Sequence, residues 1–119
     1  MVTCAPIVVE RLGKINLIHV LGELDISNCS ELTAAIDAAG TSNEGAIVIA
    51  FVECTYVDTS GLAALVAAHR KYGPRLHVVV QNESKIRRMF EATGLDRALL
   101  IHPDFRQAIA EASHPLVHG

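Results

Sequence analysis

The sequence lacks any apolar run close to the roughly 20 residues that a helix needs to cross a membrane. Its first residues also lack the basic start and long apolar stretch of a secretory signal peptide. We therefore expect a cytoplasmic protein with no membrane partner.

Basic residues are too few and too scattered for a nucleic-acid-binding surface. The chain has 10 Lys and Arg residues against 13 Asp and Glu residues, which gives a net charge of −3. The basic clusters, at residues 69–71 and 85–88, are short. Domains that bind DNA or RNA usually carry a basic stripe or patch, so we expect no direct nucleic-acid partner.

Cysteine is scarce, and its placing excludes the common cysteine-based sites. Cys4, Cys29 and Cys54 are far apart and form no Cys-x-x-Cys motif, which argues against a zinc ribbon or a redox pair. Their odd number argues against a disulfide framework, and we expect Cys29 and Cys54 to fill space in the core. No two histidines of the domain stand at metal-ligand spacing, and no phosphate-binding Gly-x-x-x-x-Gly-Lys loop is present. We therefore predict neither a metal nor a cofactor.

Half of the 119 residues are hydrophobic, enough for one domain with a core of its own. Short apolar runs predict strands, and apolar residues at helical spacing predict helices between and after them. Strands that alternate with helices form a mainly parallel sheet, and an opening hairpin around Gly13 makes it mixed. We predict an α/β domain over residues 1–112, with four or five strands and about four helices, and a flexible tail at 113–119. The predicted strands lie near residues 7–9, 15–21, 46–51, 76–80 and 98–101.

Local signals predict where the helices begin and end. Asn28 and Glu31 resemble a capping pair, and Gly40 is a natural stop for the first helix. Gly94 is expected to end the third helix, and Pro103 to lie in the first turn of the last. Residues 22–25 are expected to end the second strand.

Residues 58–62, Asp-Thr-Ser-Gly-Leu, place two hydroxyls where a buried strand leads into a helix. The first N–H groups of a helix lack partners within it, and Asp, Thr and Ser side chains accept hydrogen bonds from them. Gly61 allows a tight turn and leaves the neighbouring hydroxyl uncrowded. The helix dipole also favours negative charge here, so a phosphate could be carried at the same place. A structural cap and a modification site both remain open at this point.

A serine hydrolase would need a Gly-x-Ser-x-Gly elbow and a base close to the nucleophile. No glycine stands two residues before Ser60. His69 lies roughly 13 Å away along the helix axis, at a rise of 1.5 Å per residue. We therefore predict a protein that is not an enzyme.

The chain resembles the STAS family and, within it, the bacterial anti-sigma factor antagonists. The resemblance covers about residues 7–112 and is carried by three landmarks in order: residues 22–25 (Gly-Glu-Leu-Asp), 58–62 and 93–95 (Thr-Gly-Leu). It implies a STAS-like fold and a protein that binds an anti-sigma factor that is also a serine kinase. It further implies that the kinase phosphorylates the antagonist, which abolishes binding, and that a separate serine phosphatase restores it.

The resemblance also assigns residues. The phosphorylated hydroxyl corresponds to Ser60, just before Gly-Leu, with Thr59 as second choice. The implied partner-binding residues are Gly22, Glu23, Asp25, Asp58, Thr59, Ser60, Gly61, Leu62, Ala63 and Ala64.

This sequence departs from the family pattern at two places. Relatives often have a small, glycine-containing turn where this chain has residues 53–55, and a second glycine where it has Ala63-Ala64. Both differences bear on which partner fits. One alternative within the fold also stays open: some STAS modules are unphosphorylated scaffold subunits of larger assemblies, such as ABC-type lipid transporters or stress-sensing complexes.

Overall fold

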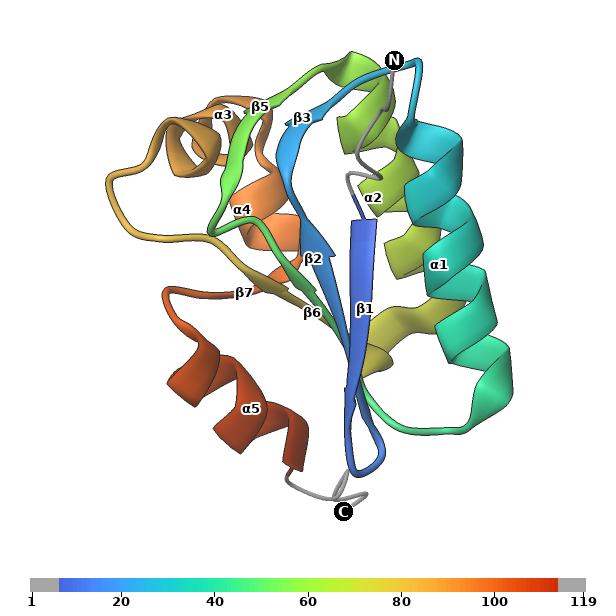
Figure 1. Cartoon of the computed structure of the whole chain (residues 1–119). Coiled ribbons are helices and arrows are strands. Elements are labelled where there is room, and N and C mark those ends of the chain that lie inside the picture. Colours follow the sequence, from blue (N-terminus) through green and yellow to red (C-terminus); the bar gives the residue numbers. More distant parts are fainter. Residues whose placement is uncertain (1–6, 114–119) are drawn as a thin grey trace.

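The centre of the fold is a five-stranded sheet in the order β1-β2-β4-β6-β7 (Figure 1). The structure is a computed structural model, which describes residues 7–113. β1 pairs with β2 antiparallel, and every other neighbouring pair in this sheet is parallel. The predicted mixed, mainly parallel sheet is therefore confirmed. Its strands are β1 (Ile7–Leu12), β2 (Ile15–Val20), β4 (Ile47–Ala50), β6 (Leu76–Val79) and β7 (Leu100–His102).

A second sheet of two short strands was not predicted. Strand β3 (Gly22–Leu24) runs parallel to β5 (Cys54–Val57). Gly22 has a φ of +70°, a left-handed conformation that glycine adopts at no steric cost, so the chain changes direction after β2. Residues 22–25 thus do more than end the second strand, because their first three form a strand of their own.

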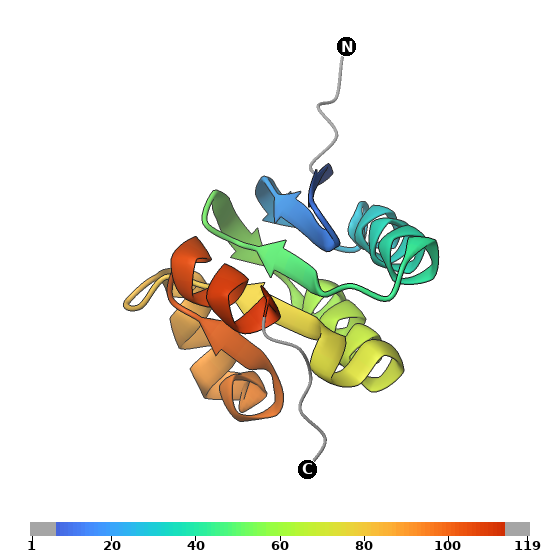
Figure 2. The same ribbon diagram turned by 90° about the horizontal axis from the view of Figure 1, so that it is seen from below.

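Within residues 7–113, four α-helices pack on one face of the main sheet and one packs on the other. Figure 2 shows α1 and α2 on one side of the sheet and α5 on the opposite side. The larger hydrophobic cluster contains Ile18, Ile49 and Val78, whereas the smaller one, beneath α5, contains Leu17, Val48 and Val79. The helices are α1 (Cys29–Ser42), α2 (Thr59–Tyr72), α3 (Lys85–Thr93), α4 (Leu95–Ala98) and α5 (Phe105–Ser113), with a 3-10 turn at Gly73–Arg75.

Several predicted helix ends differ from those observed. The Asn28 side chain makes no cap on α1; it accepts from the Asp25 amide and donates to the Glu23 carbonyl. Gly94, with a φ of +81°, ends α3 as predicted. Ala98 belongs to α4, so the last strand begins two residues later, at Leu100.

The last helix begins at Phe105, two residues after Pro103, which was predicted to lie in its first turn. The Asp104 carboxylate accepts a hydrogen bond from the Gln107 amide, and Pro103 precedes this cap. The helix includes Ser113, the last described residue and the first of the tail expected at 113–119, and the other residues of that tail lie outside the described residues.

Gly40 lies inside α1 instead of ending it, because α1 and α2 approach closely there. A Cβ atom at position 40 would lie 2.2 Å from Cε1 of Tyr72. The Tyr72 hydroxyl donates to Asp37 Oδ1 at 2.6 Å, and Lys71 Nζ donates to the same oxygen at 3.0 Å. Glycine is therefore required by helix packing at this position.

The Gly40→Ala variant should be less stable than the wild type by about 1–3 kcal/mol, because the added methyl overpacks the contact with Tyr72. Helix propensity alone predicts the opposite sign, a gain of about 1 kcal/mol. Urea unfolding followed by circular dichroism measures the difference. A variant at least as stable as the wild type would show that the two helices separate easily.

Two histidines pair beneath α5. His77 of β6 is buried, and its Nδ1 lies 3.0 Å from Nε2 of His102 on the neighbouring β7. Burial lowers the pKa of His77, His102 lowers it further, and Glu111 of α5 opposes both effects. Burial also lowers the pKa of His102, against the opposing charges of Glu111 and Asp104.

The stability of the domain should therefore fall as the pH decreases through the unfolded-state histidine pKa of 6.5. Below that pH the unfolded chain binds protons that the folded chain resists, so the free energy of unfolding decreases with acidity. Urea unfolding at pH 7.5 and pH 5.5 measures this, and His77→Leu should show a weaker dependence. If the free energy of unfolding falls equally in His77→Leu and the wild type, groups other than His77 cause the pH dependence.

Candidate partner-binding site

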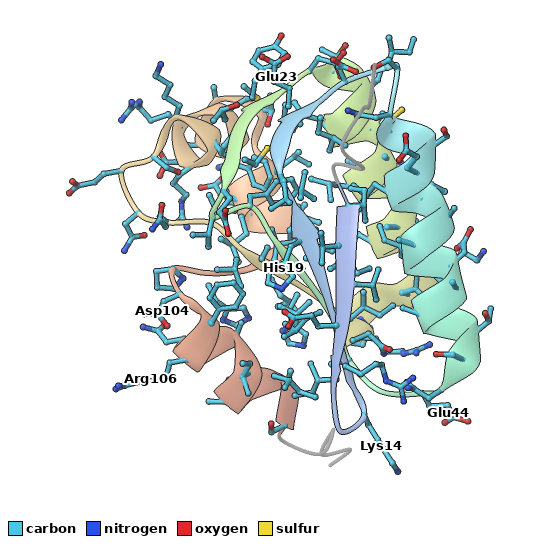
Figure 3. All side chains as sticks on the ribbon, in the orientation of Figure 1. Lys14, His19, Glu23, Glu44, Asp104 and Arg106 are labelled. Atoms are coloured by element: carbon cyan, nitrogen blue, oxygen red, sulfur yellow. The ribbon has the colours of Figure 1, made fainter. Side chains whose placement is uncertain are left out.

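The segments 22–25 and 58–62 meet at one end of the molecule. In the β3–β5 pair, Glu23 is the partner of Tyr56 and Leu24 is the partner of Val57, so β3 lies beside the strand that leads into α2. Figure 3 places Glu23 at this end and Lys14 and Glu44 at the opposite end. Sequence reasoning named both segments, and the structure brings them together.

Asp58 is the residue that joins the two segments. Its Oδ1 accepts from the Gly61 amide at 3.0 Å, the bond of a helix N-cap. Its Oδ2 accepts from the Ile26 amide at 3.2 Å, and its own amide donates to the Leu24 carbonyl at 3.0 Å. The first turn of α2 is thereby fixed to the loop between β3 and α1.

The two hydroxyls occupy the first two positions of α2. Thr59 is exposed and Ser60 is half-buried. Neither side chain hydrogen-bonds to another residue within 7–113, since Asp58 already supplies the cap. The helix therefore does not need either hydroxyl to satisfy its first amides.

Two of the predicted contact residues lie beneath the surface. Gly61 is buried, and Leu62 is 9% exposed. A Cβ at Gly61 would lie 2.8 Å from Val57 Cγ1 and 2.9 Å from Leu24 Cδ2. Glycine is needed at position 61 because α2 starts directly against the β3–β5 pair. The backbone of Gly61 is not left-handed, so close packing and not the φ angle is the reason.

The other predicted residues lie at or near the surface. Gly22, Glu23, Thr59 and Ala63 are exposed, whereas Asp25, Asp58, Ser60 and Ala64 are half-buried. The amide and hydroxyl of Ser27 both donate to Asp25 Oδ1, and the hydroxyl bond in particular holds the pKa of Asp25 below its usual range. Asp25 is therefore a carboxylate at neutral pH.

Sequence reasoning missed two apolar side chains at this end. Ile26 is 77% exposed, and Tyr56 of β5 is 48% exposed. An isoleucine inside the polar run Asp-Ile-Ser-Asn was the available signal for the first, because such a loop has no packing need for it. We call the following set the junction surface: Glu23, Asp25, Ile26, Tyr56, Thr59, Ser60 and Ala63.

The thiols of Cys29 and Cys54 are at least partly buried. Cys54 is buried and Cys29 half-buried, as expected for core fillers, and burial raises the pKa of the Cys54 thiol. Among residues 7–113, no group of three or more His, Cys, Asp or Glu side chains is placed to hold a metal ion. No helix in this part of the chain is both long and apolar enough to span a membrane.

The fold and the order of the landmarks agree with a known family. The family model described as "Mlab, STAS domain" matches residues 7–114. The chain belongs to the STAS domain family. No curated protein sequence matches it.

Solved STAS structures share the architecture. An anti-sigma factor antagonist from Mycobacterium paratuberculosis is 26% identical, with a TM-score of 0.81 over 91% of this chain and 93% of that one. The unphosphorylated form of the anti-sigma factor antagonist SpoIIAA is 16% identical, with a TM-score of 0.66 over 88% and 94% of the two chains. The phosphorylated form of Bacillus SpoIIAA is 21% identical, with a TM-score of 0.63 over 87% and 96%. The likeness to SpoIIAA concerns the fold.

The Gly61→Ala variant should lose about 1–3 kcal/mol of stability, and Gly61→Val more, because each added atom overpacks Leu24 and Val57. Urea unfolding measures the loss. The matched control is Ala67→Val on the exposed face of the same helix, which should lose at most about 0.7 kcal/mol through helix propensity. Equal losses at both positions would show that the contact beneath Gly61 relaxes freely.

Proposed function

We propose that the chain is an anti-sigma factor antagonist whose binding to an anti-sigma factor kinase ends when Ser60 is phosphorylated. The proposal is supported by the likeness to the Mycobacterium paratuberculosis antagonist, which is 26% identical to this chain. The observation that carries it is that the hydroxyls of Thr59 and Ser60, at the start of α2, bond to no other side chain within residues 7–113, on the end of the molecule that also exposes Ile26 and Tyr56.

The chemistry is a phosphoryl transfer in which this chain is the substrate. The kinase would move the γ-phosphoryl group of ATP to the Ser60 oxygen, with loss of the hydroxyl proton and release of ADP. The product carries about −1.5 to −2 charges and three acceptor oxygens at neutral pH. The amides and dipole of a helix start stabilise such a group, so the fold tolerates it.

The loss of binding follows from the same charge. A partner packed against the junction surface would have to cover a dianion on a surface that already includes the exposed Glu23 and the half-buried Asp25. Covering an unpaired charge is unfavourable, whereas the core below the surface does not change. SpoIIAA has the same fold as this chain in both its unphosphorylated and its phosphorylated form, which is consistent with a switch confined to the surface.

Incubation with ATP and a candidate anti-sigma factor kinase from the same organism should add one phosphate, detected by intact mass. Ser60→Ala should abolish the addition, whereas Thr59→Val should keep it. Ser60→Asp should weaken kinase binding about 100-fold, which corresponds to roughly 2.7 kcal/mol, and Ser60→Ala should bind like the wild type.

Other results assign a different role. If Thr59→Val but not Ser60→Ala abolishes the added phosphate, the modified residue is Thr59, the exposed neighbour of Ser60. No phosphate, together with equal binding of the wild type and both Ser60 variants to a transporter or stress-complex subunit, would support an unphosphorylated scaffold subunit. A serine phosphatase that removes the phosphate would complete the proposed cycle.

A further inference from the structure

Ile26 forms the apolar tip of the loop between β3 and α1. It is 77% exposed, the highest value among the large hydrophobic residues in 7–113. The loop around it is held in place: Asn28 Oδ1 accepts from the Asp25 amide, Asn28 Nδ2 donates to the Glu23 carbonyl, and both bonds measure 2.9 Å. An apolar side chain on an ordered loop can be buried by a partner without much further loss of conformational entropy.

The backbone of Ile26 is connected to the start of α2 through one side chain. Asp58 Oδ2 accepts from the Ile26 amide, and Asp58 Oδ1 accepts from the Gly61 amide. The two amides are far apart in sequence, yet one carboxylate serves both. Hydrogen bonds to an ionised acceptor are stronger than neutral ones, so this bridge contributes substantially to the position of the loop.

The surroundings of Ile26 are acidic. Residues 22–31 contain Glu23, Asp25 and Glu31 and no Lys or Arg. Glu23 and Glu31 are exposed, and Asp25 is half-buried. A surface that buries Ile26 therefore needs an apolar pocket bordered by basic side chains, because complementary charge favours the correct encounter and orientation.

We propose that Ile26 is the apolar anchor by which the partner kinase holds this chain, in an apolar pocket bordered by Lys or Arg. We further propose that Asp58 is a positioning residue that makes the Ile26 loop sensitive to charge on Ser60. This inference rests on the proposed function. Ser60 lies in the first turn of α2, where the Gly61 amide donates to Asp58. A phosphate on Ser60 would compete with Asp58 for that amide and would repel the Asp58 carboxylate. The hydrogen bond to Ile26 is weakened as a result, and the anchor loses its fixed position.

Amide hydrogen exchange by NMR tests the bridge without any partner. Asp58→Ser keeps a good N-cap for α2, but its single short oxygen cannot also reach Ile26. The Ile26 amide should exchange at least about tenfold faster in this variant, since a hydrogen bond to a charged group is lost, while the Gly61 amide stays protected. Glu53→Gln removes an exposed negative charge at the same end and should leave both amides unchanged.

Protein with phosphoserine incorporated at position 60 gives the second comparison. Its Ile26 amide should also exchange about tenfold faster than that of the unmodified chain, by the competition described above. Unchanged exchange of Ile26 in the phosphoserine protein would overturn the coupling, and unchanged exchange in Asp58→Ser would show that Asp58 does not hold the loop.

Binding to the anti-sigma factor kinase tests the anchor. Ile26→Ser should weaken binding at least about tenfold, in line with loss of a buried apolar contact, with no change in unfolding by urea. The matched control is Leu12→Ser, an apolar residue 49% exposed on β1, which should bind like the wild type. Wild-type levels of binding by Ile26→Ser would refute the anchor and leave the proposed function standing. If the wild type binds no kinase, the proposed function fails and so does the anchor, while the exchange experiments still decide the coupling.

Discussion

The candidate site depends on one carboxylate shared between two backbone amides. Asp58 caps α2 through Gly61 and holds the loop between β3 and α1 through Ile26. Its amide adds a third bond, to the carbonyl of Leu24. Two of these bonds therefore join segments that are distant in the chain. Asp58 supplies the side-chain cap of α2. Among residues 7–113, the hydroxyls of Thr59 and Ser60 therefore have no part in capping this helix.

The packing below the site makes this arrangement rigid. Leu24 and Val57 are at most 1% exposed and lie against Gly61, so the start of α2 rests directly on the β3–β5 pair. Burial of each such side chain contributes about 1.5–3 kcal/mol. Sites supported by strands and helices hold their geometry better than sites on loops alone. The exposed members of the junction surface thus stand on a closely packed base.

The main sheet could be predicted from the sequence, because a short, uninterrupted apolar run such as residues 46–51 is typical of a strand buried on both faces. The β3–β5 pair could not, since strands of three and four residues with Gly22 and Glu23 among them give almost no periodic signal. Gly40 was misjudged for a related reason: a glycine that ends a helix and a glycine that admits a tyrosine ring look alike in sequence. The sequence named segments 22–25 and 58–62, which meet at the candidate site. It also held a signal for Ile26, an isoleucine within a polar run, whose meaning became clear only from its 77% exposure.

The two faces of the main sheet are covered very unequally. Four α-helices lie over one face, whereas α5 alone lies over the other, on a small cluster that includes Leu17, Val48 and Val79. Since α5 follows every strand in the chain, a protein cut just before Phe105 would retain its whole sheet and the Asp58 bridge, yet present a bare aliphatic face to water. Contiguous apolar surface of that kind promotes self-association. The nine residues of α5 thus cover apolar surface that would otherwise favour self-association.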